Sequence, residues 1–442
     1  MDHAALHSLV PKIESETSRA QTGLKSKPGK FRSFCATLGP GLVAGAADDD
    51  PSGIATYSIA GAKQGFELLF LAYLTWPLMA AVQMMCARIG MVTGEWLTGS
   101  LRKKFPKPVI VLASSALFAA NTINIGADLS GMADAAEMVT GINSKVFVLL
   151  FGGAIACATV QLSYQRIARW LKWLTLALFS YIVCAFLVVE DWPRVLAATF
   201  FPKWAGGSES WKMIVAILGT TISPYLFFWQ ASQEVEEEKC AGRRSKARRA
   251  GATSEEIRHR KTDVALGTLL SNVVMYFIIL TAAVTLHNRG LTEIETSRQA
   301  AEALRPVAGR FAALLFTLGI IGVGFLAIPT LAGSAAYALA ETFRWRQGLN
   351  EPPRRARQFY LVVVASVAFG ICFDFIGLNP MKALLWSAIL NGLLAPFLLV
   401  GVLLVAVDEK LMHGQTSSSL SRWTVGLTAL LMFAAGAAIF IL

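Results

Sequence analysis

Two short polar breaks in otherwise apolar segments hold the residue types that could do chemistry in this chain of 442 residues. The first break, residues 47–53, reads ADDDPSG and lies in an apolar stretch from about 34 to 62. The second, residues 219–225, reads GTTISPY and lies in a stretch from about 214 to 230. A carboxylate at membrane depth needs a partner, and so do the carbonyl groups that a proline frees in a spanning helix. Because such oxygens are ligands of hard cations, the breaks predict a cation site.

Asp50 is the leading candidate for a charged ligand, because it directly precedes Pro51. Proline lacks an N–H and disfavours a helix that continues through the residue before it. The freed carbonyl of Ala47, one turn back, is a second candidate. The alternative interpretation is a helix end at the membrane surface with three solvated aspartates. Apolar chain on both sides of the break makes that alternative the weaker one.

Asp48 and Asp49 extend the acidic run. Successive residues of a helix turn by about 100°, so the three carboxylates cannot all face one ion. One of the two would face the site or its entrance, and the other would accept a hydrogen bond from a neighbouring helix. Asp49 is therefore either a ligand or an acceptor around the site, and the sequence does not separate these two interpretations.

Ser223 and the carbonyl of Thr220 are the corresponding candidates in the second break. The alternative is an ordinary proline kink, in which hydroxyl groups bond to their own helix. Further along, four glutamates precede a segment, 239–261, that holds nine Lys and Arg. They indicate either an acidic exit for cations or a solvated helix end, and they are Glu234, Glu236, Glu237 and Glu238.

The composition is that of an integral membrane protein. It is 55% hydrophobic and 16% charged, with a mean hydropathy of +0.53, whereas soluble domains are about a quarter charged. The net charge of +11 does not indicate a nucleic-acid partner, because most Lys and Arg lie in short loops between apolar runs. The six Cys form no CxxC motif, and the five His lie in termini or loops, so neither a disulfide framework nor a Cys/His metal site is expected.

Eleven apolar runs are long enough to span a membrane. With the N-terminus in the cytoplasm, the inner segments hold 30 of the 40 Lys and Arg, a strong topology signal. The C-terminus then lies outside. The expected spans are 34–62, 66–90, 108–136, 146–163, 170–190, 210–233, 263–286, 311–341, 358–376, 381–407 and 423–442.

The breaks fall in the first and sixth of these spans. Because five is an odd number, two consecutive blocks of five spans have opposite topology. Each block would begin with a broken helix, as in LeuT-like inverted repeats. We therefore predict an all-α membrane protein with a 5+5 inverted repeat and one extra helix. The expected parts are a cytoplasmic tail (1–33), a first repeat (34–190), an extracellular loop (191–209), a second repeat (210–407), and a loop with the eleventh helix (408–442).

Residues 39–97, beginning GPGLVAGAADDDPSGIATYS, closely resemble the first two helices of the NRAMP family of divalent-metal transporters. Weaker resemblance continues through 218–230, 263–272 and 390–397. The resemblance implies a LeuT-like fold and a transporter rather than an enzyme. It also implies transport of Mn²⁺ or Fe²⁺ together with protons, the usual activity of the family.

The departures from the family pattern lie at its ligand positions. Its first-helix Asp-Pro-Gly-Asn motif reads Asp-Pro-Ser-Gly here, so Gly53 replaces the Asn ligand. Its sixth-helix Met-Pro-His motif reads Ser-Pro-Tyr, and a second His aligns with Gln230. In the third helix Asp128 matches the family's Asp, but Gly131 stands at its Glu. The tenth-helix Gln aligns near Ala388, and Asn391, one turn away, could supply an oxygen or simply bond to another helix.

The changes at the Met and His positions remove thioether and imidazole groups, which suit Mn²⁺, Fe²⁺ and softer ions, and leave oxygen ligands, which suit Mg²⁺. The small residues Ser223 and Gly53 also leave room for the water that Mg²⁺ retains. The pattern resembles the NRAMP-related magnesium transporters. It predicts a uniporter-like transporter of Mg²⁺, and also of Mn²⁺, without tight proton coupling.

The expected setting is a plasma or bacterial inner membrane, with the lipid bilayer and the transported ion as partners. No resident cofactor and no obligate protein partner are expected, and no Gly-rich ATP-binding motif is present. Two alternatives remain open. One is a proton-coupled Mn²⁺/Fe²⁺ symporter, and the other is a sodium-coupled symporter of an organic solute, whose carboxylate the acidic run 48–50 would repel.

Overall fold

The computed structural model describes residues 45, 48–162, 176–203, 206–243 and 245–441. All regular elements of these residues are helices, and they belong to a unit that runs from Pro40 to Leu442. The predicted all-α class is therefore confirmed.

Nine helices of the described residues are long and apolar enough to cross a membrane. Eight are continuous: α6 (Phe70–Thr93), α8 (Lys107–Thr140), α9 (Ser144–Gln161), α16 (Ser254–Thr285), α19 (Ala312–Thr342), α20 (Arg357–Asp374), α21 (Pro380–Ala406) and α22 (Ser419–Ile441). The ninth consists of two pieces, α13 (Ser208–Thr221) and α14 (Pro224–Cys240). The expected spans 34–62 and 170–190 correspond to α5 (Pro51–Gln64) and α11 (Phe179–Val188). Residues 34–44, 46–47 and 170–175 of these spans lie outside the described residues. The total of eleven remains a prediction.

Both predicted breaks are present, and each second half begins at a proline. Asp50 has an extended backbone and caps α5, which starts at Pro51. Ile222 leaves the helical conformation after α13, Ser223 is extended, and α14 starts at Pro224. Proline is well suited to the first helical position, where its missing N–H has no partner to lose. Pro329, by contrast, lies inside the single helix α19, as expected for span 311–341.

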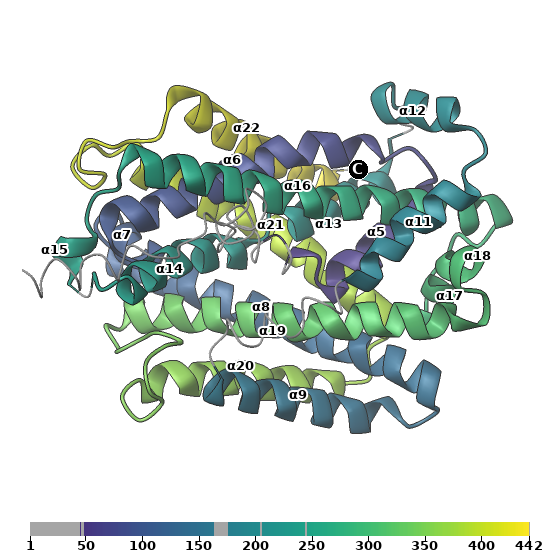
Figure 1. Ribbon diagram of the computed structural model, residues 1–442, viewed down its shortest axis with the longest axis horizontal. Helices are drawn as coiled ribbons and strands as arrows, with labels where there is room; N and C mark the ends of the chain where they lie inside the picture. The colour runs from purple at the N-terminus through teal and green to yellow at the C-terminus, as the bar shows by residue number, and fades with distance from the viewer. Residues whose placement is uncertain (1–44, 46–47, 163–175, 204–205, 244, 442) are drawn as a thin grey trace, which may run out of the picture. The chain divides into compact units, whose positions relative to one another are not determined.

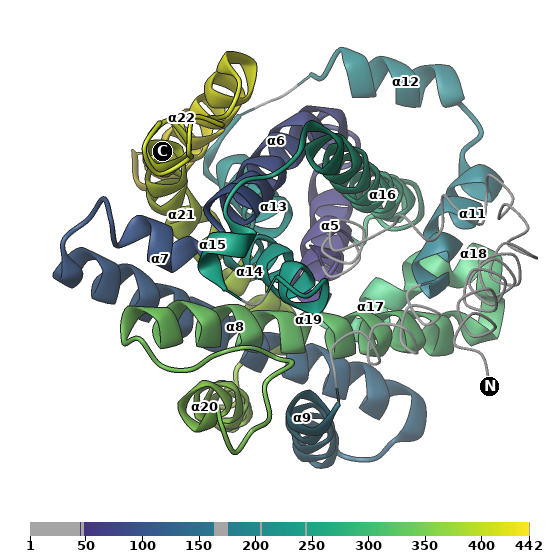
Figure 2. The same ribbon diagram turned by 60° about the vertical axis from the view of Figure 1, so that its left-hand side comes forward.

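The helices form two packed groups (Figures 1 and 2). In the first group, α5 packs against α13 and α16, and α6 packs against α14 and α16. In the second group, α8 packs against α9, α19 and α20, which Figure 1 shows together in the lower part of the view. Helix α21 contacts α5, α13 and α8, so it joins the two groups, and α22 packs against α21. The two breaks therefore lie where the groups meet.

Two glycines let the broken helices approach their neighbours closely. A β-carbon at Gly219 of α13 would lie 2.0 Å from the carbonyl oxygen of Ala388 on α21. A β-carbon at Gly61 of α5 would lie 2.3 Å from the carbonyl oxygen of Ile279 on α16. Since no side chain fits at such distances, backbone meets backbone, and the break segments are held directly against α16 and α21.

The connections contain short helices. The expected extracellular loop 191–209 holds α12 (Trp192–Phe200), whose first turn is capped by Asp191. The other short helices are α7 (Leu97–Leu101), α15 (Lys246–Arg249), α17 (Ser297–Ala301) and α18 (Arg305–Ala308). Single 3-10 turns occur at η1 (Leu176–Leu178), η2 (His287–Arg289), η3 (Glu302–Leu304) and η4 (Gly309–Phe311).

Candidate metal-binding site

Asp50 lies at the start of α5, where it is buried and is held from both sides. Its Oδ1 accepts hydrogen bonds from the backbone N–H of Gly53 and the hydroxyl of Ser52, each over 2.7 Å. Its Oδ2 accepts from the side-chain amide of Asn124 on α8 over 3.0 Å. The carboxylate is therefore oriented by its own helix and by a helix of the second group, which fixes the direction of its remaining lone pairs.

Asn124 connects Asp50 to two further oxygen-bearing side chains. Its amide nitrogen also lies 3.3 Å from Oδ2 of Asp128, and its oxygen accepts from Asn391 of α21 over 3.4 Å. Oδ1 of Asp128 and the side-chain oxygen of Asn391 are buried and have no hydrogen-bond partner among the described residues. An orphaned buried acceptor is costly, so each of these oxygens calls for a hydrogen-bond donor or a cation.

Asp48 and Asp49 both turn toward α16 rather than α8. The hydroxyl of Ser271 lies 2.7 Å from Asp48 Oδ2 and 3.1 Å from Asp49 Oδ1. One hydroxyl proton thus serves two buried carboxylates, and Asp48 Oδ1 has no partner among the described residues. This geometry gives Asp49 the neighbouring-helix contact that was one of its two expected roles, and it gives Asp48 the same contact.

Ser223 bonds backward to α13 and does not cap α14. Its hydroxyl donates to the carbonyl oxygens of Gly219 and Thr220, over 2.6 and 2.7 Å. This is the back-bonding expected of an ordinary proline kink, and it partly occupies the Thr220 carbonyl. That carbonyl keeps a second lone pair, and the negative end of the α13 dipole lies beside it.

The two broken helices are joined by a hydrogen bond between Thr220 and Tyr57. The Thr220 hydroxyl donates to the phenolic oxygen of Tyr57 on α5 over 3.1 Å, and both residues are buried. The structure therefore brings Asp50, Ser223, Thr220 and Asn391 into one buried region. The carbonyl of Ala47, another expected ligand, lies outside the described residues.

This region holds several carboxyl groups and no described cation. Four carboxylates, those of Asp48, Asp49, Asp50 and Asp128, are buried, and none of them pairs with a Lys, Arg or His that the structure describes. No group of three or more His, Cys, Asp or Glu in the described part of the chain has the arrangement of a metal site. The donors that the structure places around Asp50 are amide, hydroxyl and carbonyl oxygens besides the carboxylates. Mg²⁺, which keeps several waters, fits such a donor set.

The altered family positions have definite surroundings. A β-carbon at Gly53 would lie 3.4 Å from Asp50 Oδ1, so this position borders the carboxylate and leaves space beside it. A β-carbon at Gly131 would lie 2.8 Å from the Leu384 side chain, which thus occupies the place of a larger residue. Gln230 donates to Glu234 over 2.7 Å. At Gly131 the acidic group is replaced by apolar packing.

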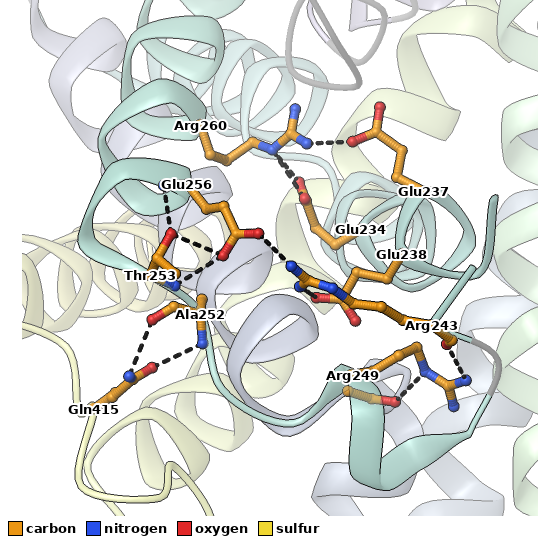
Figure 3. Close-up of polar contacts among 11 residues, drawn as sticks. Glu234, Glu237, Glu238, Arg243, Arg249, Ala252, Thr253, Glu256, Arg260 and Gln415 are labelled. Carbon is orange, nitrogen blue, oxygen red and sulfur yellow. Dashed lines mark hydrogen bonds and ion pairs between the residues drawn. The ribbon is translucent and has the colours of Figure 1, made fainter. Parts of the chain in front are cut away.

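The acidic end of α14 is an ion-paired network (Figure 3). Arg260 of α16 lies 2.7 Å from Glu234 and also pairs with Glu237 of α14 and Asp263 of its own helix. Glu234 and Glu236 are buried, so this is not the solvated helix end considered from the sequence. The network joins α14 to α16 and leaves fewer free carboxylates for an acidic exit.

Sequence reasoning did not place Asn124, Tyr57 or Ser271 at the site. The side-chain amide of Asn124 contacts Asp50, the leading ligand candidate. A polar residue inside an apolar span was the available signal, but it does not show which helix the side chain faces.

A family model described as natural resistance-associated macrophage protein-like (Nramp) matches residues 41–442. The divalent metal cation transporter MntH of Mesorhizobium japonicum is 27% identical over 395 residues, covering 86% of this chain and 83% of the relative. The protein of the same name from Klebsiella pneumoniae is 24% identical over 426 residues, covering 94% and 93%.

Solved structures share the fold. The manganese transporter of Eremococcus coleocola superposes with a TM-score of 0.70 at 17% identity, covering 93% of this chain and 87% of that chain. A transporter of the nucleobase-cation-symport-1 family gives a TM-score of 0.55 at 16% identity, covering 91% of each chain. At these identities the likeness concerns the fold alone, and it confirms the predicted LeuT-like architecture.

Proposed function

Because the chain belongs to the Nramp family, whose members are membrane transporters of divalent metal cations and not enzymes, we propose that its substrates are Mg²⁺ and also Mn²⁺. The observation that carries this proposal is the set of four buried carboxylates, three at the first break and Asp128 on α8, without a described cationic partner. Uncompensated buried charge is strongly unfavourable, so a bound divalent cation would relieve it.

The donor types support the choice of a hard ion. The groups around Asp50 are carboxylate, amide, hydroxyl and carbonyl oxygens, and the position of the family's thioether holds Ser223. Oxygen donors select Mg²⁺ and Mn²⁺ over softer metals. In this proposal Asp50 is the charged ligand, and the carbonyls of Thr220 and Ala47 coordinate the ion or its waters. Asp49, Asn391 and the space beside Gly53 complete the site.

Transport would follow the alternating-access scheme of the fold, in which one group of helices rocks against the other around a central site. The ion would sit between the broken helices, whose ends supply backbone oxygens without a helical partner. The contact between Asp50 on the first group and Asn124 on the second would respond to that motion.

Tight proton coupling is not part of this proposal. The family's relay positions hold Tyr225, Gln230 and Gly131, and neither Gln nor Gly titrates, while a Tyr ordinarily titrates near pH 10. The membrane potential suffices: about 2.3 kcal/mol per charge per 100 mV gives roughly 4.6 kcal/mol for two charges. At about 1.4 kcal/mol per factor of ten, this corresponds to accumulation of over a thousandfold.

The proposed setting is a plasma or bacterial inner membrane with the N-terminus in the cytoplasm and the C-terminus outside. The distribution of Lys and Arg among the loops supports this orientation. The proposed repeats are residues 34–190 and 210–407, in agreement with the positions of the two breaks.

A second candidate, the proton-coupled Mn²⁺/Fe²⁺ symporter, is favoured by one observation. Asp128 keeps the family's acidic residue, and its Oδ1 is buried without a described partner, as a proton carrier would be.

Uptake into proteoliposomes tests the proposed substrate. Purified protein is reconstituted, a negative-inside potential is imposed, and internal Mg²⁺ and Mn²⁺ are followed with fluorescent indicators. We expect both ions to enter in response to the potential, at a rate above that in protein-free vesicles. Entry of Mn²⁺ with no entry of Mg²⁺ at millimolar concentration would refute the magnesium assignment and leave the family activity standing.

A further inference from the structure

A pocket of about 620 Å³ lies between α6, α16 and the start of α22, and it contains none of the residues of the metal site. One wall is the apolar face of α6 from Pro77 to Met85. The polar end is formed by Arg88, Lys261, Ser417 and Ser421, which come from three separate segments. A pocket of this size accommodates a small ligand, and its lining calls for one that is apolar at one end and polar at the other.

The cations of the pocket lack carboxylate partners. Neither Arg88 nor Lys261 forms an ion pair with an Asp or Glu of the described residues. Arg260, next to Lys261, forms ion pairs with three carboxylates. Arg88 donates its Nε to the backbone oxygen of Gln415 over 3.0 Å, which positions the guanidinium. Its terminal N–H groups have no described acceptor, so the polar end suits an anion with several oxygens.

Ser417 supplies a second, independent indication. The residue is 2% exposed and lines the pocket, yet its hydroxyl has no hydrogen-bond partner among the described residues. Its backbone oxygen accepts from Arg422 over 2.8 Å, which fixes the segment before α22. The 23-residue helix α22 starts at Ser419, so the positive end of its dipole also faces this region.

The pocket lies at the level of a membrane boundary. Trp423, in the first turns of α22, is 79% exposed, and exposed tryptophan is typical of the interface between lipid and water. The neighbouring connections carry most of the Lys and Arg, which assigns this end to the cytoplasmic side.

We propose that this pocket binds the phosphate headgroup of an anionic phospholipid of the inner leaflet. Arg88 and Lys261 neutralise the phosphate, the hydroxyl of Ser417 donates to one of its oxygens, and the acyl chains lie along the apolar face of α6. Basic pockets between helices on the cytoplasmic side are well suited to such headgroups. The lipid would join α6, α16 and α22 and would thereby favour the arrangement of these helices described above.

The test is native mass spectrometry of the full-length protein with added phosphatidylglycerol or phosphatidylcholine. We expect phosphatidylglycerol to bind preferentially, and the double variant Arg88→Gln/Lys261→Gln to weaken its binding about 25-fold. That factor corresponds to about 1 kcal/mol per basic residue near a lipid surface. Ser417→Ala should weaken binding by a smaller factor, because it removes one hydrogen bond to a charged group.

The matched control is Lys107→Gln/Arg354→Gln, which removes the same charge from exposed residues with no described partner at the same end of the helices. It should bind phosphatidylglycerol as the parent protein does. Equal loss in both double variants, equal binding of the two lipids, or displacement of the lipid by millimolar inorganic phosphate would each overturn the proposal. A monodisperse profile in size-exclusion chromatography shows that each variant is folded. If the double variant is not folded, the single variant Ser417→Ala provides the test.

Discussion

The side-chain amide of Asn124 on α8 lies 3.0 Å from Oδ2 of Asp50, the residue that caps α5. This bond links the two groups of helices at the first break. The same amide nitrogen lies 3.3 Å from Asp128, so one neutral group holds two carboxylates in place. A cation that binds Asp50 must therefore share this carboxylate with Asn124 or displace it, which couples ion binding to the contact between the groups.

Asp50→Ala should abolish uptake of Mg²⁺ and Mn²⁺. The change removes the proposed charged ligand, and we expect a loss of at least about 100-fold, since even partners behind the ligands typically contribute 10- to 100-fold. Uptake into proteoliposomes is the measurement. The control Glu190→Ala changes an exposed acid outside the site and should transport normally. Wild-type uptake by the Asp50 variant would exclude this residue as the main ligand.

Asn124→Ala should raise the KM for the transported ion by about 10- to 100-fold, because Asp50 loses the bond that orients it. Asn121→Ala is the matched control. Asn121 lies on the same helix but donates to the backbone oxygen of Leu331 and to Ser334, away from the site. Its loss should lower thermal stability and leave KM unchanged. Equal KM values for the two variants would argue against a positioning role for Asn124.

Ser223→Met should shift selectivity from Mg²⁺ toward Cd²⁺ and Mn²⁺. A thioether beside the ion favours softer metals and takes room from the waters of Mg²⁺. Competition of Cd²⁺ and Mg²⁺ against Mn²⁺ uptake measures the shift. Ser223→Ala removes the same hydroxyl without adding sulfur and should not gain Cd²⁺ transport. If the Met variant keeps the parental ion preference, Ser223 does not line the site.

Uptake of Mg²⁺ should proceed without a fixed flow of protons. With a pH indicator inside proteoliposomes, we expect potential-driven metal entry with little internal acidification. Acidification in constant proportion to metal entry would contradict the uncoupled mechanism and support a proton-coupled symporter. In that case Asp128→Asn, which removes the remaining acid of the family's third-helix pair, should reduce the proton flow.

Gly219→Ala should destabilise the protein, because the new β-carbon would lie 2.0 Å from the carbonyl oxygen of Ala388. Overpacking of this kind typically costs about 1–3 kcal/mol. Gly153→Ala on α9 is the opposite control, since nothing lies within 4 Å of its β-carbon and alanine favours a helix by about 1 kcal/mol. Thermal unfolding in detergent compares them. A Tm of the Gly219 variant at or above the parental value would contradict the close packing of α13 and α21.

The sequence by itself determined the helical class and the two breaks, because both follow from local properties. Long apolar runs must hydrogen-bond internally in lipid, and they become helices wherever the chain lies in the membrane. Pro51 and Pro224 each stand at the first position of a helix, where a proline has no N–H to lose. The acidic residue before Pro51 and the Ser before Pro224 were therefore recognisable as candidates without any tertiary contact.

The tertiary structure alone decided which groups surround Asp50. Asn124 is 74 residues away along the chain, and Ser271 is 223 residues from Asp48. Helices that are apolar on nearly all sides carry little periodic signal, so the sequence does not show how each one is rotated about its axis. In the folded protein Asp48 and Asp49 contact α16, whereas Asp50 contacts α8. The hydroxyl of Ser223 donates back to α13. Packing between helices sets these directions, and the order of residues along one helix cannot.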